Sequence, residues 1–145
     1  MPVEYRTGDL FSSDADALAH GCNCQGVMGA GIAIQFKKRY PEMFKEYRNR
    51  CLKQQFVVGS IYSYSAFDRK RIYNLGTQQY PGACASLVAI KVLLAQICDE
   101  YFDIEEGPIR SVAIPRIGCG LGGLNWLDVK EVIEEVGSKT KIKLI

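Results

Sequence analysis

Two glycine-rich segments carry the residue types in this chain that are best suited to binding a ligand. Their sequences are GVMGAGI at 26–32 and GCGLGGL at 118–124. Glycine lets a backbone turn tightly and come close to a ligand, and successive N–H groups can then point at one anion. A helix that follows such a loop adds the positive end of its dipole. One glycine-rich loop is more often only a turn, whereas two of them predict a diphosphate that is held from both sides.

Neither segment fits the two familiar nucleotide-binding motifs. A P-loop requires a lysine followed by Ser or Thr after its glycines, and both segments lack that pair. The second segment contains Gly118-x-Gly120-x-x-Gly123, but it lies too late in the chain to be followed by the remaining strands of a dinucleotide-binding fold. The identity of the ligand therefore depends on other residues.

Three polar residues near the loops are candidates for contact with that ligand. Asp9 follows the first predicted strand, where its carboxylate suits either a turn or the exocyclic amine of adenine. Asn23 precedes the first glycine-rich loop, and its amide suits either a turn or a ribose hydroxyl. His20 is the single histidine, and a lone histidine is more often structural than catalytic.

The hydrophobic pattern predicts alternating strands and helices that would position these residues. Strands are expected at 3–5, 15–19, 56–66, 71–75, 109–114 and 141–145, with a hairpin turn at 68–70. Helices are expected at 30–40, 41–51 and 86–101, and a last helix is expected between the cap Asn125 and the stop Gly137. This order predicts an α/β fold with a mixed, largely parallel sheet covered by helices on both faces. Ligands of such sheets bind at the carboxyl ends of the strands.

Length and composition favour one soluble domain over residues 1–145. Hydrophobic residues make up 48% of the chain and charged residues 23%. The net charge of +2 is too small to favour nucleic acid or a membrane surface as the main partner. The chain has no signal-peptide core and no apolar run of membrane-spanning length, so we expect a cytoplasmic protein. Nothing in the pattern indicates an oligomer, and we expect a monomer.

The cysteines do not indicate a metal site. Six of them stand at 22, 24, 51, 84, 98 and 119, without a CxxC pair or a cluster with histidine. Most lie within apolar stretches, which is typical of reduced, partly buried thiols in the cytosol. We therefore expect neither a metal nor another cofactor.

Two longer runs that contain these loops resemble the macrodomain family. They read TGDLFSSDADALAHGCNCQGVMGAGIAIQFKKRYPEMF at 7–44 and SVAIPRIGCGLGGLNW at 111–126. The similarity is greatest to the branch that contains terminal ADP-ribose protein glycohydrolases and related bacterial enzymes, and it covers nearly the whole chain. The resemblance implies a three-layer α/β/α fold with an ADP-ribose cleft at one end of the sheet.

The resemblance also implies which part of ADP-ribose each residue contacts. Asp9 matches the aspartate that reads adenine, with the Leu10 amide beside it, and Asn23 matches a polar residue at the distal ribose. The first loop is implied near the distal ribose and phosphate through Gly29, Ala30, Gly31 and Ile32. The second loop is implied around the diphosphate through Gly118, Cys119, Gly120, Leu121 and Gly122.

The catalytic pair of the glycohydrolase branch is missing from this chain. The lysine that attacks the sugar carbon corresponds to about Gln78, and its partner aspartate to about Gly122. A second macrodomain pattern has two asparagines before the first loop, and here His20 replaces the first while Asn23 keeps the second. If the protein is an enzyme, we expect substrate-assisted hydrolysis by a positioned water, in which Asn23 orients the ribose and His20 is a candidate base.

Three functions remain open on these observations. The first is hydrolysis of ADP-ribosyl linkages on a macromolecule or of O-acetyl-ADP-ribose, which the intact loops favour. The second is a reader module that binds ADP-ribose without turnover, which the missing catalytic pair favours. The third is a nucleotide- or nucleic-acid-binding module, for which the basic run 69–71 is weak support.

Overall fold

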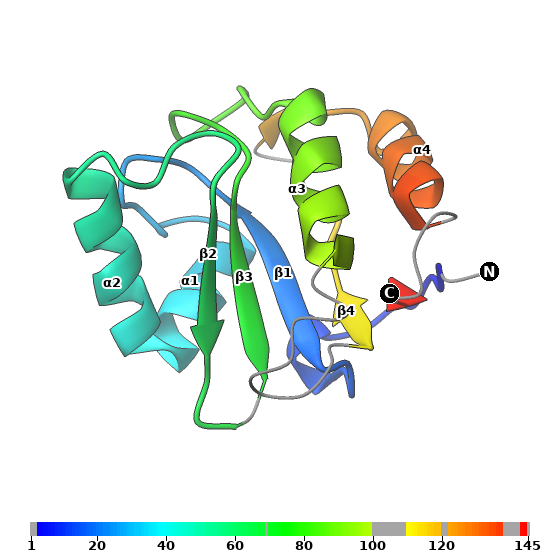
Figure 1. The fold of residues 1–145 in the computed structure, drawn as a ribbon, viewed down its shortest axis with the longest axis horizontal. Coiled ribbons are helices and arrows are strands. Elements are labelled where there is room, and N and C mark those ends of the chain that lie inside the picture. The colour runs from blue at the N-terminus through cyan, green and yellow to red at the C-terminus, as the bar shows by residue number, and fades with distance from the viewer. Residues whose placement is uncertain (1–2, 69, 100–109, 120–121, 138–142, 145) are drawn as a thin grey trace.

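The strands of the chain form one mixed sheet, shown in Figure 1. The computed structural model describes residues 3–68, 70–99, 110–119, 122–137 and 143–144. Within these residues the strand order is β2-β3-β1-β4-β5. The strands are β1 (Ala17–Cys22), β2 (Ile61–Ser65), β3 (Arg71–Gly76), β4 (Ser111–Ala113) and β5 (Lys143–Leu144).

Strand β1 is the centre of the sheet. Its Ala17 pairs with Arg71 of β3 on one side and with Val112 of β4 on the other, and both pairings are parallel. The β4–β5 pairing is also parallel, whereas β2 and β3 form an antiparallel hairpin. The prediction of a mixed, largely parallel sheet is confirmed.

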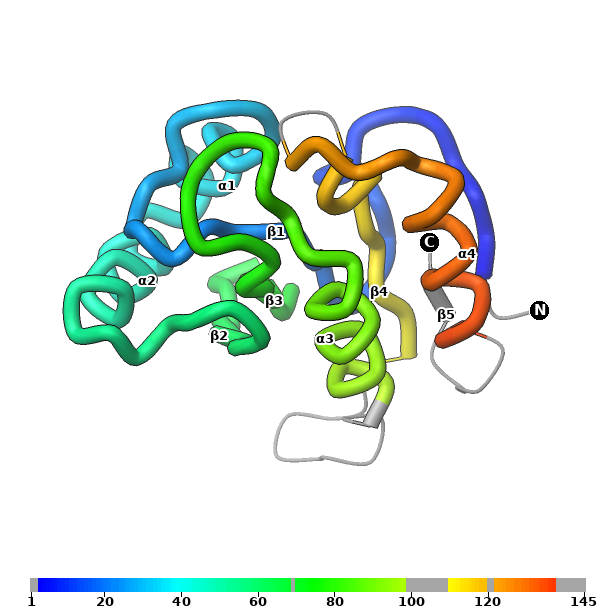
Figure 2. Tube along the Cα trace, turned by 90° about the horizontal axis from the view of Figure 1, so that it is seen from above, coloured from blue at the N-terminus to red at the C-terminus, as the bar shows by residue number. Residues whose placement is uncertain are grey.

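Helices cover both faces of this sheet, as Figures 1 and 2 show. They are α1 (Ile32–Arg39), α2 (Pro41–Leu52), α3 (Leu87–Asp99) and α4 (Trp126–Gly137). One buried cluster joins the sheet to α1 and α2 through Phe36, Met43 and Tyr47. The other joins it to α3 and α4 through residues such as Leu94 and Ile133. The predicted three-layer α/β/α arrangement is therefore confirmed.

Local signals in the sequence explain several element boundaries. Pro41 is the first residue of α2, where its missing N–H costs nothing. Asn125 caps α4, because its Oδ1 accepts a hydrogen bond from the Leu127 amide at 2.9 Å. Ser86 does the same for α3, with its Oγ 3.1 Å from the Ala89 amide. The predicted caps and stops thus lie close to the observed helix ends.

Some predicted strands differ from the structure. The strand expected at 56–66 begins only at Ile61, because Gly59 has a φ of +93° that belongs to a turn. The strand expected at 3–5 is reduced to a single bridge at Val3. Tyr5 instead packs edge-on against Trp126 of α4, and its hydroxyl donates to Glu134 at 2.7 Å. The parts of the predicted elements at 100–101, 109, 141–142 and 145 lie outside the described residues.

The parallel strands bring three loops to one edge of the sheet. Strands β1, β3 and β4 end at Cys22, Gly76 and Ala113, and their parallel pairing places these ends at the same edge. In Figure 2 the loops that follow them lie beside one another. Among the described helices, none has the length and apolar character needed to cross a bilayer.

Candidate functional site

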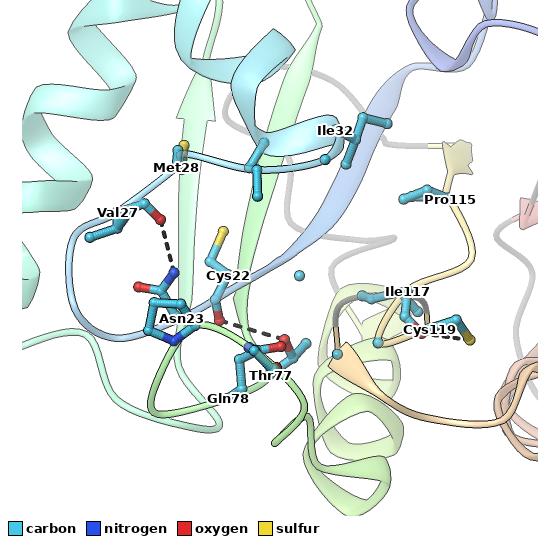
Figure 3. A pocket seen from close by; sticks show the side chains of 18 of the residues that line it. Cys22, Asn23, Val27, Met28, Ile32, Thr77, Gln78, Pro115, Ile117 and Cys119 are labelled. Carbon is cyan, nitrogen blue, oxygen red and sulfur yellow. Dashed lines mark hydrogen bonds between the residues drawn. The ribbon is translucent and has the colours of Figure 1, made fainter.

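A cavity of about 810 Å³ opens at this edge of the sheet (Figure 3). It lies between the first glycine-rich loop, the segment after β3 and the second glycine-rich loop. Its walls include residues that the sequence singled out, namely Asn23, Gly29, Ala30, Gly31, Ile32, Gln78, Gly118, Cys119 and Gly122. The two glycine-rich segments, which are about 90 residues apart in the chain, therefore face one space.

A second cavity of about 680 Å³ adjoins the first. Ile32 and Pro115 line both, so these two side chains form the wall between them. Asp9 and Leu10 line the second cavity, together with Gln35 of α1. The two cavities make an elongated cleft with room for a ligand that has two bulky ends.

The first loop leads into α1 with an open helix N-terminus. Gly31 precedes the helix with a φ of +61°, and no side chain caps the first turn. Gly31, Ile32 and Ala33 all line the larger cavity. Because the first N–H groups of a helix have no partner within the helix, this turn presents donors and a positive dipole end to an anion in the cavity.

Asn23 and Tyr47 fix the shape of the first loop. The Asn23 Nδ2 donates to the Val27 carbonyl at 2.9 Å, and its Oδ1 accepts from the Gln25 amide at 2.9 Å. The hydroxyl of Tyr47, a fully buried residue of α2, donates to the Asn23 carbonyl at 2.8 Å. The Asn23 amide therefore has one N–H left for a ligand, and its main observed contacts hold the loop.

The segment 77–86 connects the two glycine-rich loops. The Gln79 carbonyl accepts from the Cys24 amide at 3.2 Å and from the Gln25 Nε2 at 3.0 Å. At the other end of the segment the Ala85 amide donates to the Gly122 carbonyl at 3.1 Å. Sequence reasoning noted Gln78 in this segment but missed Thr77, Pro81 and Gly82, which line the cavity too. The Pro-Gly pair marks a turn after a strand, and that signal could have found them.

The second loop turns tightly at Gly118. Its φ is +76°, and a Cβ at this position would lie 2.7 Å from Ile90 and 2.8 Å from Leu124. The loop closes through the Leu124 amide, which donates to the Gly118 carbonyl at 2.9 Å. Gly120 and Leu121, which the resemblance also assigns to the ligand, lie outside the described residues. Glycine is thus required at 118 both by the backbone and by the packing.

His20 lies in the core and lines neither cavity. Its ring is fully buried and stacks on Phe36, with 3.8 Å between the ring centroids. Nε2 lies 2.7 Å from Asn74 Oδ1, so the proton is on Nε2 and points to that oxygen. Burial lowers the pKa of His20 to about 4, although the bond to Asn74 opposes this. The base role considered for His20 therefore has no support in the geometry, because the ring cannot reach a ligand.

The thiols of the larger cavity are held in their neutral form. Burial raises the pKa of Cys22 well above its ordinary value, and nearby Cys51 and Cys24 raise it further. Burial also raises the pKa of Cys119, although Arg116 opposes it. Neither thiol is a ready nucleophile, since the thiolate is the reactive form. In the described part of the chain, no three or more His, Cys, Asp or Glu side chains are grouped to hold a metal ion.

Asp9 is positioned at the second cavity by a short 3₁₀ helix, η1 (Leu10–Ser12). Its carboxylate accepts from the Phe11 amide at 3.0 Å and from the Ser12 hydroxyl at 3.4 Å. The residue is exposed and lines the cavity, so its carboxylate remains accessible to a further donor. Asp9 therefore caps η1 and lines the second cavity at the same time.

Comparison with known proteins shows to which protein family this chain belongs. The Macro domain family model matches residues 19–133, which include both glycine-rich loops. The chain belongs to the Macro domain family. The predicted resemblance is confirmed, and the cleft lies at the sheet edge where ligands of open α/β sheets bind.

Individual relatives show how similar this macrodomain is to known proteins in sequence and in structure. A DNA ADP-ribosyl glycohydrolase of Mycobacterium tuberculosis is 39% identical over 132 residues, which cover 89% of this chain but 37% of that protein. The solved macrodomain of Mycobacterium tuberculosis DarG superposes with a TM-score of 0.89 at 33% identity, covering 99% of this chain and 95% of that one. Thermosipho africanus DarTG in complex with ADP-ribose superposes with a TM-score of 0.84 at 26% identity, covering 94% of this chain and 39% of that one.

Proposed function

We propose that this macrodomain binds ADP-ribose across the two adjoining cavities and hydrolyses ADP-ribosyl linkages on a macromolecule. The observation that carries the proposal is the cleft divided by Ile32 and Pro115, with Asp9 at one end and both glycine-rich loops at the other. The adenosine occupies the cavity beside Asp9. The diphosphate lies over the wall between the cavities, against the N-terminus of α1, and the distal ribose fills the larger cavity.

The DNA ADP-ribosyl glycohydrolase relative supports DNA as the carrier of the ADP-ribosyl group. In the reaction, the oxygen of a water forms a bond to the distal ribose C1″ while the bond from C1″ to the carrier atom breaks. One proton of the water remains as the new hydroxyl hydrogen, and the other passes to the leaving atom.

The larger cavity supplies positioning rather than a strong base. Among its described lining residues, Arg116 carries the single formal charge, and its guanidinium lies 4.9 Å from the centre of the Trp126 ring. The thiols of Cys22 and Cys119 have raised pKa values. The rate therefore rests on holding water, diphosphate and ribose in line, with the ligand phosphate close to the attacking water.

A reader that binds ADP-ribose without turnover is the second candidate. The described lining residues of the larger cavity include no strong base, and this favours the reader, because slow chemistry would leave a stable complex. Both functions use the same binding site, so binding alone does not separate them.

Cys22, Cys24, Cys51, Cys84 and Cys119 are thiols outside any disulfide, and this supports a cytoplasmic protein. Unpaired thiols persist in the reducing conditions of that compartment. Cell fractionation with an antibody to the chain tests the location.

The function is tested first by binding and then by turnover. Calorimetric titration should give dissociation constants in the micromolar range for ADP-ribose, with much weaker binding of AMP. No binding of ADP-ribose near 1 mM, a free energy of only about −4 kcal/mol, would refute the cleft assignment. An ADP-ribosylated single-stranded oligonucleotide, followed by anion-exchange chromatography, should then release ADP-ribose. Tight binding without release over many hours would establish the reader.

A further inference from the structure

We propose that the Gln78 Oε1 is a fixed hydrogen-bond acceptor that recognises a hydroxyl of the distal ribose. The inference rests on the proposed function, since it takes the distal ribose to lie in the larger cavity. The proposal gives Gln78 a role at the position where the family resemblance leads one to expect a catalytic lysine. The role is recognition of an uncharged sugar end rather than attack on it.

The orientation of the Gln78 amide is set by its own loop. Nε2 donates to the Tyr80 carbonyl at 2.7 Å and to the Gly82 carbonyl at 2.8 Å. A primary amide has two N–H donors, so both are used and the amide cannot rotate without losing them. Within the part of the chain that the structure describes, no donor bonds Oε1. Gln78 lines the larger cavity, and it therefore presents an unused acceptor there.

Gly122 keeps the space in front of this oxygen open. A Cβ at position 122 would lie 3.4 Å from the Gln78 Oε1 and 3.0 Å from the Ala85 Cβ. The φ of Gly122 is not in the left-handed region, so the backbone does not require glycine there. The lack of a side chain at this position leaves Oε1 accessible from the second loop.

An acceptor at this place selects a hydroxyl over an anion. Asn23 lines the same cavity with one unused N–H, so its amide offers a donor in the cavity that holds the Gln78 acceptor. A hydroxyl group can satisfy both, because it donates one hydrogen and accepts through its lone pairs. A phosphate or carboxylate at the distal end is largely deprotonated near neutral pH, and its negative charge would be repelled by the partial negative charge of Oε1.

The proposal is tested with two ligands that differ by the distal ribose. Gln78→Ala should weaken binding of ADP-ribose on the order of tenfold, as expected for the loss of one good hydrogen bond. It should change binding of ADP, which lacks the distal ribose, by less than about twofold. Gln96→Ala, an exposed residue of α3 outside both cavities, is the matched control and should leave both affinities unchanged.

The outcomes separate a ligand contact from a loop support. An equal loss for ADP-ribose and ADP in Gln78→Ala would overturn the proposal, because it would show that the side chain only holds the loop. No loss for either ligand would overturn it as well. A wild-type chain that binds ADP-ribose no better than ADP would instead count against the proposed function.

A second variant covers the case in which Gln78→Ala does not fold. Gly122→Ala keeps the Gln78 bonds to its loop and places a methyl group in front of Oε1. It should reduce the preference for ADP-ribose over ADP by a similar factor, and an unchanged preference would overturn the proposal. Melting curves of both variants show whether each is folded before its affinities are compared.

Discussion

The hydroxyl of Tyr47 donates a hydrogen bond to the backbone carbonyl of Asn23 at 2.8 Å. This contact joins the buried face of α2 to the start of the first glycine-rich loop. The same hydroxyl lies 3.4 Å from the Val27 carbonyl, which Asn23 Nδ2 also bonds. The shape of the loop, and with it the open N-terminus of α1, therefore depends on a residue that does not line the cleft.

Replacing Tyr47 with phenylalanine should destabilise the fold and weaken ligand binding together. The ring would stay in the core, but the Asn23 carbonyl would lose its buried donor at a cost of about 1–2 kcal/mol. Urea denaturation measures the stability, and calorimetry measures the affinity for ADP-ribose. Tyr5→Phe is the control, since it removes an exposed hydroxyl bonded to Glu134 that lines neither cavity. An unchanged midpoint for Tyr47→Phe would contradict the support role.

Replacing Asn23 with aspartate should harm binding more than replacing it with alanine. Aspartate keeps an acceptor for the Gln25 amide but loses the donor to Val27, and it adds a negative charge beside an anionic ligand. We expect at least a tenfold weaker affinity for ADP-ribose. Titration at low and high salt distinguishes the causes, because screening should reduce the deficit of Asn23→Asp and not that of Asn23→Ala. Equal affinities of both variants with wild type would remove Asn23 from the site.

Replacing Gly118 with alanine tests the packing of the second loop. The new Cβ would meet Ile90 and Leu124 at under 3 Å, and the φ of +76° adds strain, for a total cost of about 2–4 kcal/mol. Gly59→Ala is the matched control, with a φ of +93° and no atom within 4 Å of the new Cβ. It should cost about 1–2 kcal/mol by strain alone and leave ADP-ribose binding unchanged. Equal unfolding free energies for the two variants would show that the packing around Gly118 is loose.

The sequence predicted the parts of this fold that local signals determine. Pro41 and Asn125 mark helix starts by rules that involve one or two neighbouring residues, and both were placed correctly. The two glycine-rich loops were placed at strand ends, and the parallel pairing of β1 with β3 and β4 then brings them to one edge.

The remaining parts of the site depend on contacts that no local pattern contains. The bond of Cys24 to Gln79 joins residues 55 positions apart, and the bond of Ala85 to Gly122 joins residues 37 positions apart. The predicted strand 15–19 stops before His20, whereas β1 continues to Cys22 and contains that residue. Because β1 is buried on both faces, its sequence does not alternate in polarity and does not show that His20 packs against Phe36 in the core.

The burial of His20 should make the protein less stable in mild acid. Its pKa is lowered to about 4 in the folded chain, whereas an unfolded histidine titrates near 6.5. Well above pH 6.5 the ring is neutral in both the folded and the unfolded chain, so His20 does not reduce the free energy of unfolding there. Between pH 6.5 and about 4 the unfolded chain binds the proton and the folded chain does not, so the free energy of unfolding should fall by up to about 3 kcal/mol.

Proton NMR measures this titration directly, because His20 is the single histidine of the chain. The Cε1 proton signal of the native protein should stay at its neutral position from pH 7.5 to about 5, while the same signal in concentrated urea should shift with a midpoint near 6.5. The urea concentration at the unfolding midpoint should decrease as the pH is lowered from 6.5 toward 5. A native midpoint near 6.5 would show that water reaches the ring, and it would return His20 to the list of candidate bases.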